Sequence, residues 1–308
     1  MTRPDDHLLD ELRPRAFAIA YRMLGSVVEA EDIVQEALLR VHHTLAAGER
    51  IESPLAFVAT VTTRLAIDEL RSARRRRETY VGEWLPEPLV TDPAADPERQ
   101  AGLSNSLSLA LLLLLESLSP EQRAVFLLRE VFDYSYAEIA AVIGTSEVNV
   151  RQLAARARRY VADHRPRFEA SREQGDELAR RFFAAAQEGD LGALEALLAH
   201  DVVLHGDGGG KVPALTRPLR GRSRVARTVL AWARTLRVAG AAFRQVEVNG
   251  LPGALEFDGQ GKLIGVMALD IANGEIQTVT SIVNPDKLRH LGPVGDLRTL
   301  LERRDPHL

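Results

Sequence analysis

Apolar residues recur at helical spacing through the first quarter of the chain, about residues 5–78. One stripe runs from Leu8 through Leu12 to Met23 and stops at Gly25. Positions three and four residues apart lie on the same face of a helix, so such a stripe marks the side that is buried. The pattern predicts that this first segment consists of helices packed on one another.

Two further helices are expected before residue 78. Ser26 and Glu29 have capping-box spacing, which predicts that a helix begins there. Ser53 and Pro54 predict the start of the next helix, because proline is tolerated in the first turn. The helix after Ser26 has a second specified face, which suits a docked partner, although a solvated surface helix has the same pattern. This face consists of Asp32, Gln35, Glu36 and Leu39.

The helical pattern stops between about residues 79 and 102. Four prolines fall in this stretch, at positions 86, 88, 93 and 97. Residues before proline avoid the helical conformation, so the pattern predicts an extended linker over 79–102. Trp84 and Leu85 are unexpected there, because a solvated tether has little use for an indole. We therefore expect them to dock onto another part of the protein.

Residues 103–165 form a second helical segment, which ends in a helix-turn-helix pattern. Ser119 and Ser135 each stand three residues before Gln or Glu, and both predict helix starts. Gly144 allows a tight turn, and Ser146 can accept a hydrogen bond from the free amides that open the last helix. Off the apolar stripe of that helix lie side chains that can hold phosphates or contact base edges, namely Arg151, Gln152, Arg156 and Arg159.

Helical and alternating segments mix in the last part of the chain. Helices are expected at about 176–188, 190–199 and 222–237, and strands at 202–207, 243–248, 253–258, 263–271 and 275–283. This mixture predicts an α+β domain over 174–290, followed by a tail over 291–308.

Charge and composition narrow the function. The formal net charge of the 308 residues is -4, but five arginines cluster in residues 71–77 and six in 149–167. Two basic clusters indicate two DNA contacts. The chain has no cysteine, its eight histidines have no paired ligand spacing, and no apolar run approaches the length of a membrane span. We expect a cytoplasmic protein with no membrane contact, no metal and no cofactor.

The order and spacing of these motifs over residues 5–165 resemble the extracytoplasmic-function sigma factors of bacterial RNA polymerase. The resemblance implies two all-α domains, a region 2 helical bundle over 5–78 and a region 4 helix-turn-helix over 103–165. It implies promoter DNA and the RNA polymerase core as partners, through the beta-prime clamp helices and the beta flap. The residues that it assigns to core binding are Asp32, Gln35, Glu36 and Leu39.

The same resemblance assigns the promoter contacts. It implies that the third helix opens and reads the -10 element with Arg64, Asp68, Arg71, Arg74 and Arg75. It implies that the helix-turn-helix reads the -35 element with Ser146, Asn149, Arg151, Gln152, Arg156 and Arg159. Many relatives carry a Thr-Val-Lys-Ser-Arg-like run where this chain has residues 149–153, a departure that bears on which promoter sequence is read.

Three further motifs resemble the sigma factors that carry a C-terminal SnoaL-like domain. They are Trp84, Leu85, Pro86, Glu87 and Pro88; Asp207, Gly208, Gly209, Gly210 and Lys211; and Asn284, Pro285, Asp286, Lys287 and Leu288. The resemblance implies that residues 174–290 adopt an NTF2-like α+β cone that regulates the sigma activity within the same chain. We hypothesise that Trp84 and Leu85 pack against this domain near one of the other two motifs.

Alternatives remain at this stage. SnoaL-like folds include enzymes, and His205 and Asp207 share one side of a predicted strand, a spacing that supports acid–base chemistry. No complete catalytic set follows, because the sequence does not bring Asn249, Glu256 or Asp270 to that pair. A small ligand in the cone is a second alternative. The third is a helix-turn-helix repressor, which would bind duplex DNA without polymerase.

Overall fold

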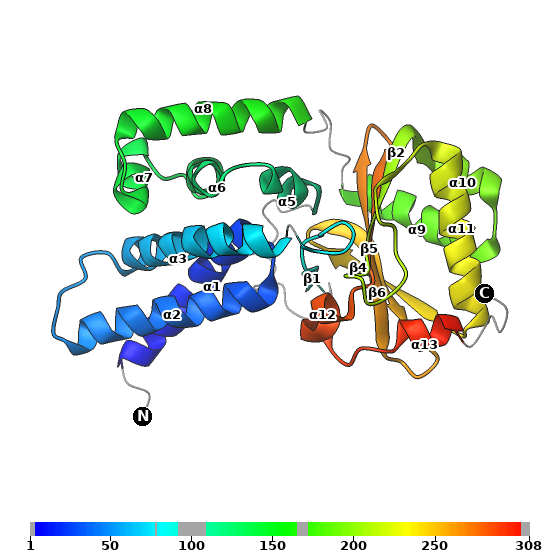
Figure 1. The fold of residues 1–308 in the computed structure, drawn as a ribbon, viewed down its shortest axis with the longest axis horizontal. Coiled ribbons are helices and arrows are strands. Elements are labelled where there is room, and N and C mark those ends of the chain that lie inside the picture. The colour runs from blue at the N-terminus through cyan, green and yellow to red at the C-terminus, as the bar shows by residue number, and fades with distance from the viewer. Residues whose placement is uncertain (1–3, 78, 92–108, 165–171, 303–308) are drawn as a thin grey trace. The chain divides into compact units, whose positions relative to one another are not determined.

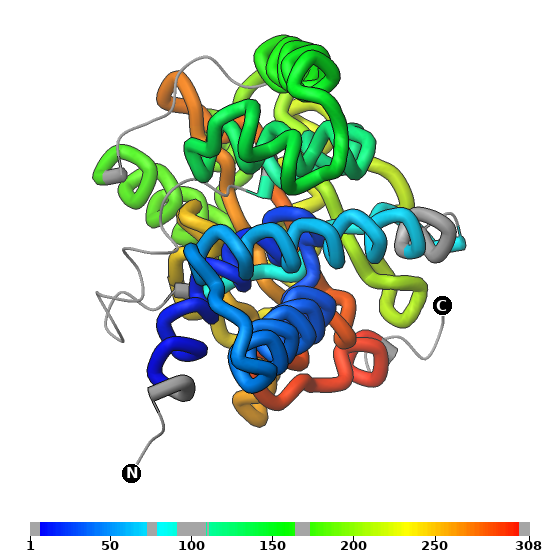
Figure 2. Tube along the Cα trace, turned by 90° about the vertical axis from the view of Figure 1, so that its left-hand side faces the viewer, coloured from blue at the N-terminus to red at the C-terminus, as the bar shows by residue number. Residues whose placement is uncertain are grey.

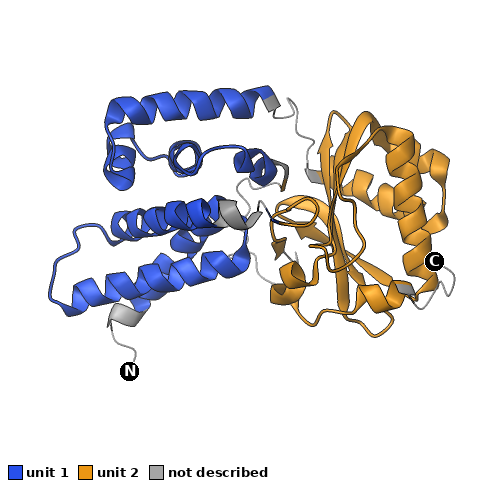
Figure 3. Cartoon of the chain, viewed as in Figure 1, with its two compact units in different colours: residues 1–79, 111–165 blue, residues 80–110, 166–308 orange. Residues whose placement is uncertain are grey.

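The computed structural model describes residues 4–77, 79–91, 109–164 and 172–302. The chain divides into two compact units (Figure 3). One unit contains residues 1–79 and 111–165, and the other contains residues 80–110 and 166–308. No helix among the described residues is long and apolar enough to cross a membrane.

The first unit begins with three helices that pack on one another (Figure 1, Figure 2). They are α1 (Pro4–Leu24), α2 (Val27–Ala46) and α3 (Pro54–Arg77). Gly25 takes a positive φ of 67° between the first two, a conformation that glycine adopts without a steric penalty. The Ser26 side chain then accepts a hydrogen bond from the amide of Glu29, so the predicted helix start is confirmed.

Five further segments complete this unit. They are α5 (Leu109–Glu116), α6 (Pro120–Phe126), the π-helical turn η1 (Leu127–Val131), α7 (Tyr136–Ile143) and α8 (Glu147–His164). Both predicted capping boxes are present, at Ser119 with Gln122 and at Ser135 with Glu138. The last helices share a small core of Val125, Leu128, Ile139, Val142, Val150 and Ala154.

The second unit is built on a seven-stranded sheet with the order β1-β4-β5-β6-β7-β2-β3. All neighbouring strands are antiparallel except β2 and β7, which are parallel. The strands are β1 (Val90–Thr91), β2 (Leu198–Asp207), β3 (Leu219–Arg220), β4 (Ala242–Val248), β5 (Leu251–Phe257), β6 (Leu263–Ala272) and β7 (Glu275–Ile282).

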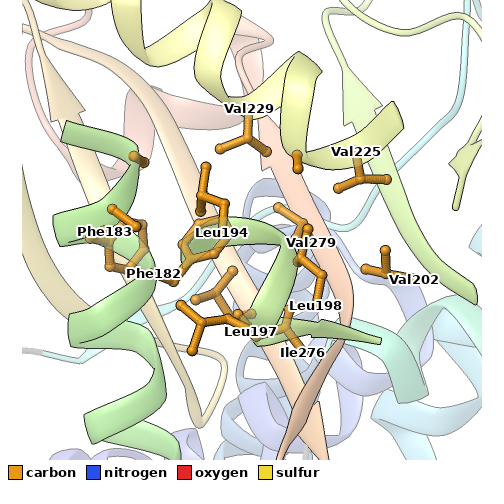
Figure 4. Close-up of a cluster of buried hydrophobic side chains, with 14 of the residues drawn as sticks. Phe182, Phe183, Leu194, Leu197, Leu198, Val202, Val225, Val229, Ile276 and Val279 are labelled. Atoms are coloured by element: carbon orange, nitrogen blue, oxygen red, sulfur yellow. The ribbon is translucent and has the colours of Figure 1, made fainter. Parts of the chain in front are cut away.

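Three helices cover one face of this sheet (Figure 1). They are α9 (Arg172–Glu188), α10 (Leu191–Leu197) and α11 (Arg222–Val238). Figure 4 shows side chains from these helices and from β2 and β7 meeting in the core, including Phe182, Leu194, Val229 and Val279. Burial of each such side chain stabilises the fold by about 1.5–3 kcal/mol relative to its exposure.

The chain ends with short helical segments on the second unit. They are α12 (Pro285–Leu288), the 3-10 turn η2 (Arg289–Leu291) and α13 (Leu297–Glu302). Leu297 is buried with Leu236, Ile264 and Val283. Part of the stretch expected to be a tail therefore contributes to the core of this unit.

The structure also differs from the sequence predictions at the linker. Residues 80–91 belong to the second unit, and β1 pairs with β4 through Val90 opposite Val248 and Thr91 opposite Glu247. The edge of the sheet supplies backbone partners that local sequence does not reveal. Residues 92–102 lie outside the described part of the chain.

Candidate functional site

The helix-turn-helix is formed by α7 and α8. Gly144 ends α7 with a φ of 70°. The Ser146 hydroxyl accepts a hydrogen bond of 3.2 Å from the amide of Asn149, as the sequence predicts. Asn149 also donates from its side chain to the Thr145 hydroxyl at 3.0 Å. These contacts hold the start of α8, the end of a recognition helix that contacts base edges in such motifs.

One side of α8 is buried and the other carries polar groups. Val150, Ala154 and Ala157 are buried. All six residues predicted to read the -35 element are exposed. They are Ser146, Asn149, Arg151, Gln152, Arg156 and Arg159. Arg151 forms an ion pair with Glu147 on the same helix. Exposed pairs of this kind contribute about 0.3–0.5 kcal/mol, so a phosphate can replace the carboxylate.

The residues predicted to contact the -10 element lie along α3. Arg64 donates from Nε to the carbonyl oxygen of Val142 at 2.7 Å and from Nη2 to that of Ala141 at 3.0 Å. Both carbonyls are in the last turn of α7, where a helix lacks internal donors and favours a cation. The guanidinium of Arg64 thus holds α3 to the end of α7.

Arg71 makes a second contact of this kind. Its guanidinium pairs with Asp68 at 3.2 Å on the same helix and with Glu121 of α6 at 2.8 Å. Arg71 and Asp68 are both exposed, so water and salt weaken these pairs. Arg74 and Arg75 lie further along α3, and their side chains are outside the described part of the structure.

The residues predicted to bind core polymerase lie on α2. Asp32, Gln35, Glu36 and Leu39 are all exposed, and their spacing places them on one face. Leu39 is 45% exposed, and Val28 on the same helix is 53% exposed. Glu36 pairs with Arg40 at 2.8 Å. The face combines two acidic side chains with an exposed leucine.

The linker meets the sheet domain at a buried carboxylate. Asp207, at the end of β2, is 1% exposed, and its carboxylate accepts four hydrogen bonds. Two of the donors belong to the linker: the Tyr80 hydroxyl donates at 2.6 Å and the Leu85 amide at 3.0 Å. The others come from the Gly209 amide at 2.9 Å and the Lys287 ammonium at 2.7 Å. A buried charge with this many donors has its lost hydration replaced.

Lys287 is the cation of the same site. Its side chain is 7% exposed, pairs with Asp207 and also donates to the carbonyl oxygen of Leu85. The ammonium lies 4.1 Å from the centre of a Trp84 ring and 5.1 Å from the centre of the Tyr80 ring. A desolvated cation is attracted to aromatic faces. The Lys287 ammonium therefore contacts both the backbone and the aromatic side chains of the linker.

Tyr80 is a hydrogen-bond donor in this site. Its hydroxyl also accepts a hydrogen bond of 2.7 Å from the Asn284 side chain. Burial, together with the hydrogen bond and charge of Asp207, raises the pKa of Tyr80 far above its usual value. The phenol therefore keeps its proton at physiological pH and continues to donate a hydrogen bond to Asp207.

The three glycines after Asp207 allow close approach. A Cβ at Gly208 would lie 2.3 Å from a carbonyl oxygen of the same loop, and one at Gly209 would lie 2.3 Å from Nδ2 of Asn284. A Cβ at Gly210 would lie 2.9 Å from Cβ of Val81, in the linker. Gly209 and Gly210 also have positive φ. The loop therefore needs glycine to pack against the 284–288 motif and against Val81 of the linker.

The charges that flank the glycines have separate partners. Lys211 pairs with Asp286, while Asp207 pairs with Lys287. Two cross pairs thus join the glycine loop to the 284–288 motif. The sequence showed the opposite charges of Asp207 and Lys211 but not these partners.

Several contacts of the linker have no counterpart in the sequence analysis. Glu83 lies 2.7 Å from Nδ1 of His205. The Leu89 amide donates to the side-chain oxygen of Asn249 at 2.9 Å, and the Asn249 amide donates to the carbonyl oxygen of Leu89 at 2.7 Å. His290 lies 2.8 Å from the carbonyl oxygen of Pro88. Asn249 has a positive φ of 52° in the β4–β5 turn. The Asn-Gly sequence at 249–250 is typical of such a turn, and it was the one local signal that pointed to this position.

The proposed acid–base pair is not assembled. His205 is paired with Glu83, Asp207 is paired with the linker donors, and no hydrogen bond joins the two among the described residues. Glu256 is fully buried, and both of its carboxylate oxygens are without a hydrogen-bond partner. No group of three His, Cys, Asp or Glu residues in the described part of the chain could hold a metal ion.

Comparison with known families matches each part of the chain. Sigma-70 region 2 matches residues 8–76, and sigma-70 region 4 matches residues 108–161. A SnoaL-like domain matches residues 179–283. The predicted fold class, two helical regions followed by an NTF2-like α+β domain, is therefore confirmed.

Similar whole proteins have the same arrangement. The ECF RNA polymerase sigma factor SigJ of Mycobacterium tuberculosis is 38% identical over 90% of this chain and 91% of its own. The probable ECF sigma factor SigI of M. tuberculosis is 34% identical over 88% and 90%. The crystal structure of M. tuberculosis SigJ has a TM-score of 0.76 at 36% identity, covering 93% of this chain and 98% of that one. This chain therefore belongs to the extracytoplasmic-function sigma factors, which direct RNA polymerase to particular promoters for transcription initiation.

Proposed function

We propose that this sigma factor is regulated within its own chain, by docking of linker residues 80–91 on the SnoaL-like domain. The observation that carries the proposal is the buried Asp207, which accepts hydrogen bonds from both Tyr80 and Leu85. Lys287 reinforces it through the Leu85 carbonyl and the Trp84 ring. The docking is specific because each charge in the site has partners from the linker.

Docking controls the length of chain that joins the two DNA-contacting regions. The linker connects α3 of region 2 to α5 of region 4, and twelve extended residues span about 40 Å at most. Residues that are held on the SnoaL-like domain cannot contribute to that span. Docking therefore selects the promoters whose -10 and -35 elements have a suitable separation, and release of the linker relaxes this selection.

Family membership supports the proposed DNA and polymerase contacts, and so does the exposure of the described residues among them. The exposed face of α8 reads the -35 element, and α3 binds the -10 element with Arg64, Asp68, Arg71, Arg74 and Arg75. The α2 face of Asp32, Gln35, Glu36 and Leu39 binds the beta-prime clamp helices, and region 4 binds the beta flap. Since Arg64 and Arg71 are engaged by region 4 in the free protein, promoter binding has to break these contacts.

The test is transcription in vitro with purified core polymerase. The templates carry one pair of promoter elements, selected from a genomic library, at spacings from three base pairs shorter to three longer than the optimum. Full-length protein is compared with Lys287→Met, which keeps the bulk of the side chain but removes its charge. The control is Lys262→Met, the same substitution at an exposed position of the same domain.

We expect the wild-type protein and the control to prefer one spacing, and Lys287→Met to transcribe from a wider range. The preference for the optimum over the flanking spacings should fall at least threefold, while binding to core polymerase stays unchanged. An identical spacing profile for all three proteins would contradict regulation by the docked linker. Failure of the wild-type protein to bind core would contradict the sigma assignment itself, and DNA binding without core would favour a repressor.

A further inference from the structure

A pocket of about 440 Å³ opens beside the linker-docking site in the SnoaL-like domain. It lies between helix α11 and the sheet, and its walls include Leu204, His205, Leu215, Trp232, Met267 and Ser281. This volume is within the range of small-molecule sites, which are largely apolar with a few polar groups. Neither the docking of the linker nor the contacts to DNA use this space.

The lining restricts the chemistry of an occupant. Among the fifteen lining residues there is no Asp, Glu, Lys or Arg, and His205 is the one titratable group. A charged ligand would lose its hydration there without gaining a partner, so the pocket favours a neutral one. The hydroxyls of Thr228 and Thr235 already donate to carbonyls of their own helix, at 2.9 Å each.

Trp232 adds an aromatic side chain to the lining. Its Nε1 is shielded from solvent, and the indole acts on the buried carboxylate of Glu256, with which it lines a separate small cavity. The indole N–H is therefore not available to an occupant of the larger pocket. Mainly apolar walls favour a mainly apolar ligand. The pocket thus suits a neutral, mainly apolar molecule.

The wall of this pocket also holds the linker. His205 lines the pocket, and its Nδ1 lies 2.7 Å from the carboxylate of Glu83 in the linker. Leu215 lines the pocket as well, and its carbonyl oxygen lies 3.8 Å from the position of a Cβ built on Gly82. The glycine loop joins these two lining residues. A ligand that orders residues 205–215 therefore orders the surface on which the linker rests.

We propose that this pocket binds a neutral, mainly apolar molecule, and that binding stabilises the docked linker through His205 and Leu215. Linkage makes the effect reciprocal, so the docked linker must also strengthen ligand binding. The consequence for transcription rests on the proposed function, whereas the binding and its coupling to the linker do not. The two can therefore be tested separately.

The probe is Prodan, a neutral naphthalene with a ketone acceptor whose fluorescence reports an apolar site. Its affinity is measured for the full-length protein and for Thr228→Phe and Ala231→Phe, each of which adds a ring to the pocket from α11. Glu83→Ala removes the carboxylate that holds His205 and lies outside the pocket lining. Glu188→Ala, an exposed position at the end of α9, is the matched control. Amide exchange over residues 80–91 is followed with and without saturating Prodan.

We expect both phenylalanine variants to weaken Prodan binding at least tenfold, Glu83→Ala to weaken it about threefold or more, and Glu188→Ala to leave it unchanged. Saturation with Prodan should slow exchange at the amides of Leu85 and Leu89. Absence of Prodan binding, or binding that both phenylalanine variants leave intact, overturns the site. The coupling is overturned if Prodan binds without slowing amide exchange in the linker and if Glu83→Ala binds Prodan as tightly as the wild-type protein does. No polymerase is present, so none of these outcomes depends on the regulatory role of the linker.

Discussion

The face of α8 and the linker-docking site both depend on charged side chains, but they place them in opposite environments. Arg156 and Arg159 are exposed, whereas Asp207 and Lys287 are buried and paired with each other. An exposed guanidinium can exchange a carboxylate for a phosphate at little cost. A buried pair cannot exchange partners cheaply, because each charge left alone is strongly destabilising. The first arrangement suits reversible DNA contacts, and the second suits a fixed docking site.

The largest effect that separates the two regions is expected at Asp207. Asp207→Ala leaves Lys287 buried without its carboxylate, which should lower the free energy of unfolding of the SnoaL-like domain by about 3–5 kcal/mol. Urea unfolding of the full-length protein, followed by amide exchange in the sheet, measures the change. The control is Asp201→Ala, an exposed carboxylate on the same strand. Equal stability of the two variants would show that the buried pair does not hold the site.

Glu256 tests what burial does to a carboxylate that has no cation beside it among the described residues. Burial raises its pKa from 4.5 to about 7, with the Trp232 indole opposing the shift. The described residues around its small cavity include no charged side chain. Between these pH values the folded protein binds more protons than the unfolded chain, so its stability falls as pH rises from about 4.5 to 7.

The expected loss is about 3 kcal/mol above pH 7. Glu256→Gln has no charge to bury, so it should remove this part of the pH dependence and raise the melting temperature at pH 8 more than at pH 5. Thermal unfolding at both pH values measures this, with Glu188→Gln as the exposed control. A parallel pH dependence for wild type and Glu256→Gln would contradict the raised pKa.

The glycine loop provides a smaller effect. Gly209→Ala combines a positive φ of 59° with a Cβ placed 2.3 Å from Asn284, so it should cost about 1–3 kcal/mol and release the linker. Gly189→Ala also has a positive φ, of 83°, but nothing lies within 4 Å of its Cβ. Exchange of the linker amides should therefore quicken in the first variant alone. If the linker amides exchanged at the same rate in Gly209→Ala and Gly189→Ala, the close approach of Gly209 to Asn284 would not be what holds the linker.

The smallest effect on stability is expected on α8. Arg156→Ala should change the free energy of unfolding by no more than about 0.5 kcal/mol, as at other exposed positions. Binding of the holoenzyme to a promoter with an intact -35 element should nevertheless weaken by about 1–3 kcal/mol. Filter binding at fixed salt measures it, with Arg180→Ala on α9 as the control. Loss of stability without loss of DNA binding would reverse the roles assigned to the two regions.

Local signals were enough to predict the first region. Ser119, Ser135 and Ser146 each act within three residues of themselves, so their caps and the helices that they begin could be read from spacing. The two basic clusters were equally visible. The contact of Arg64 with the end of α7 was not, because it joins residues far apart in the chain.

The docking site was only partly predictable. Trp84 and Leu85 were too apolar for a free linker, and the structure places them at Lys287 and Asp207. Tyr80 was missed, because nothing in the local sequence distinguishes a phenol that meets a carboxylate 127 residues later. The pairing of the linker strand β1 with β4 and the burial of Leu297 also depend on tertiary packing rather than on local pattern.

Amide exchange at Leu85 tests the central claim most directly, since this N–H donates at 3.0 Å to the buried carboxylate of Asp207. In the full-length protein at neutral pH, Leu85 should exchange at least a hundredfold more slowly than in an unstructured peptide, and Lys287→Met should remove most of that protection. Exchange at the unstructured rate in the wild-type protein would mean that the linker is not docked, and would contradict regulation through this site.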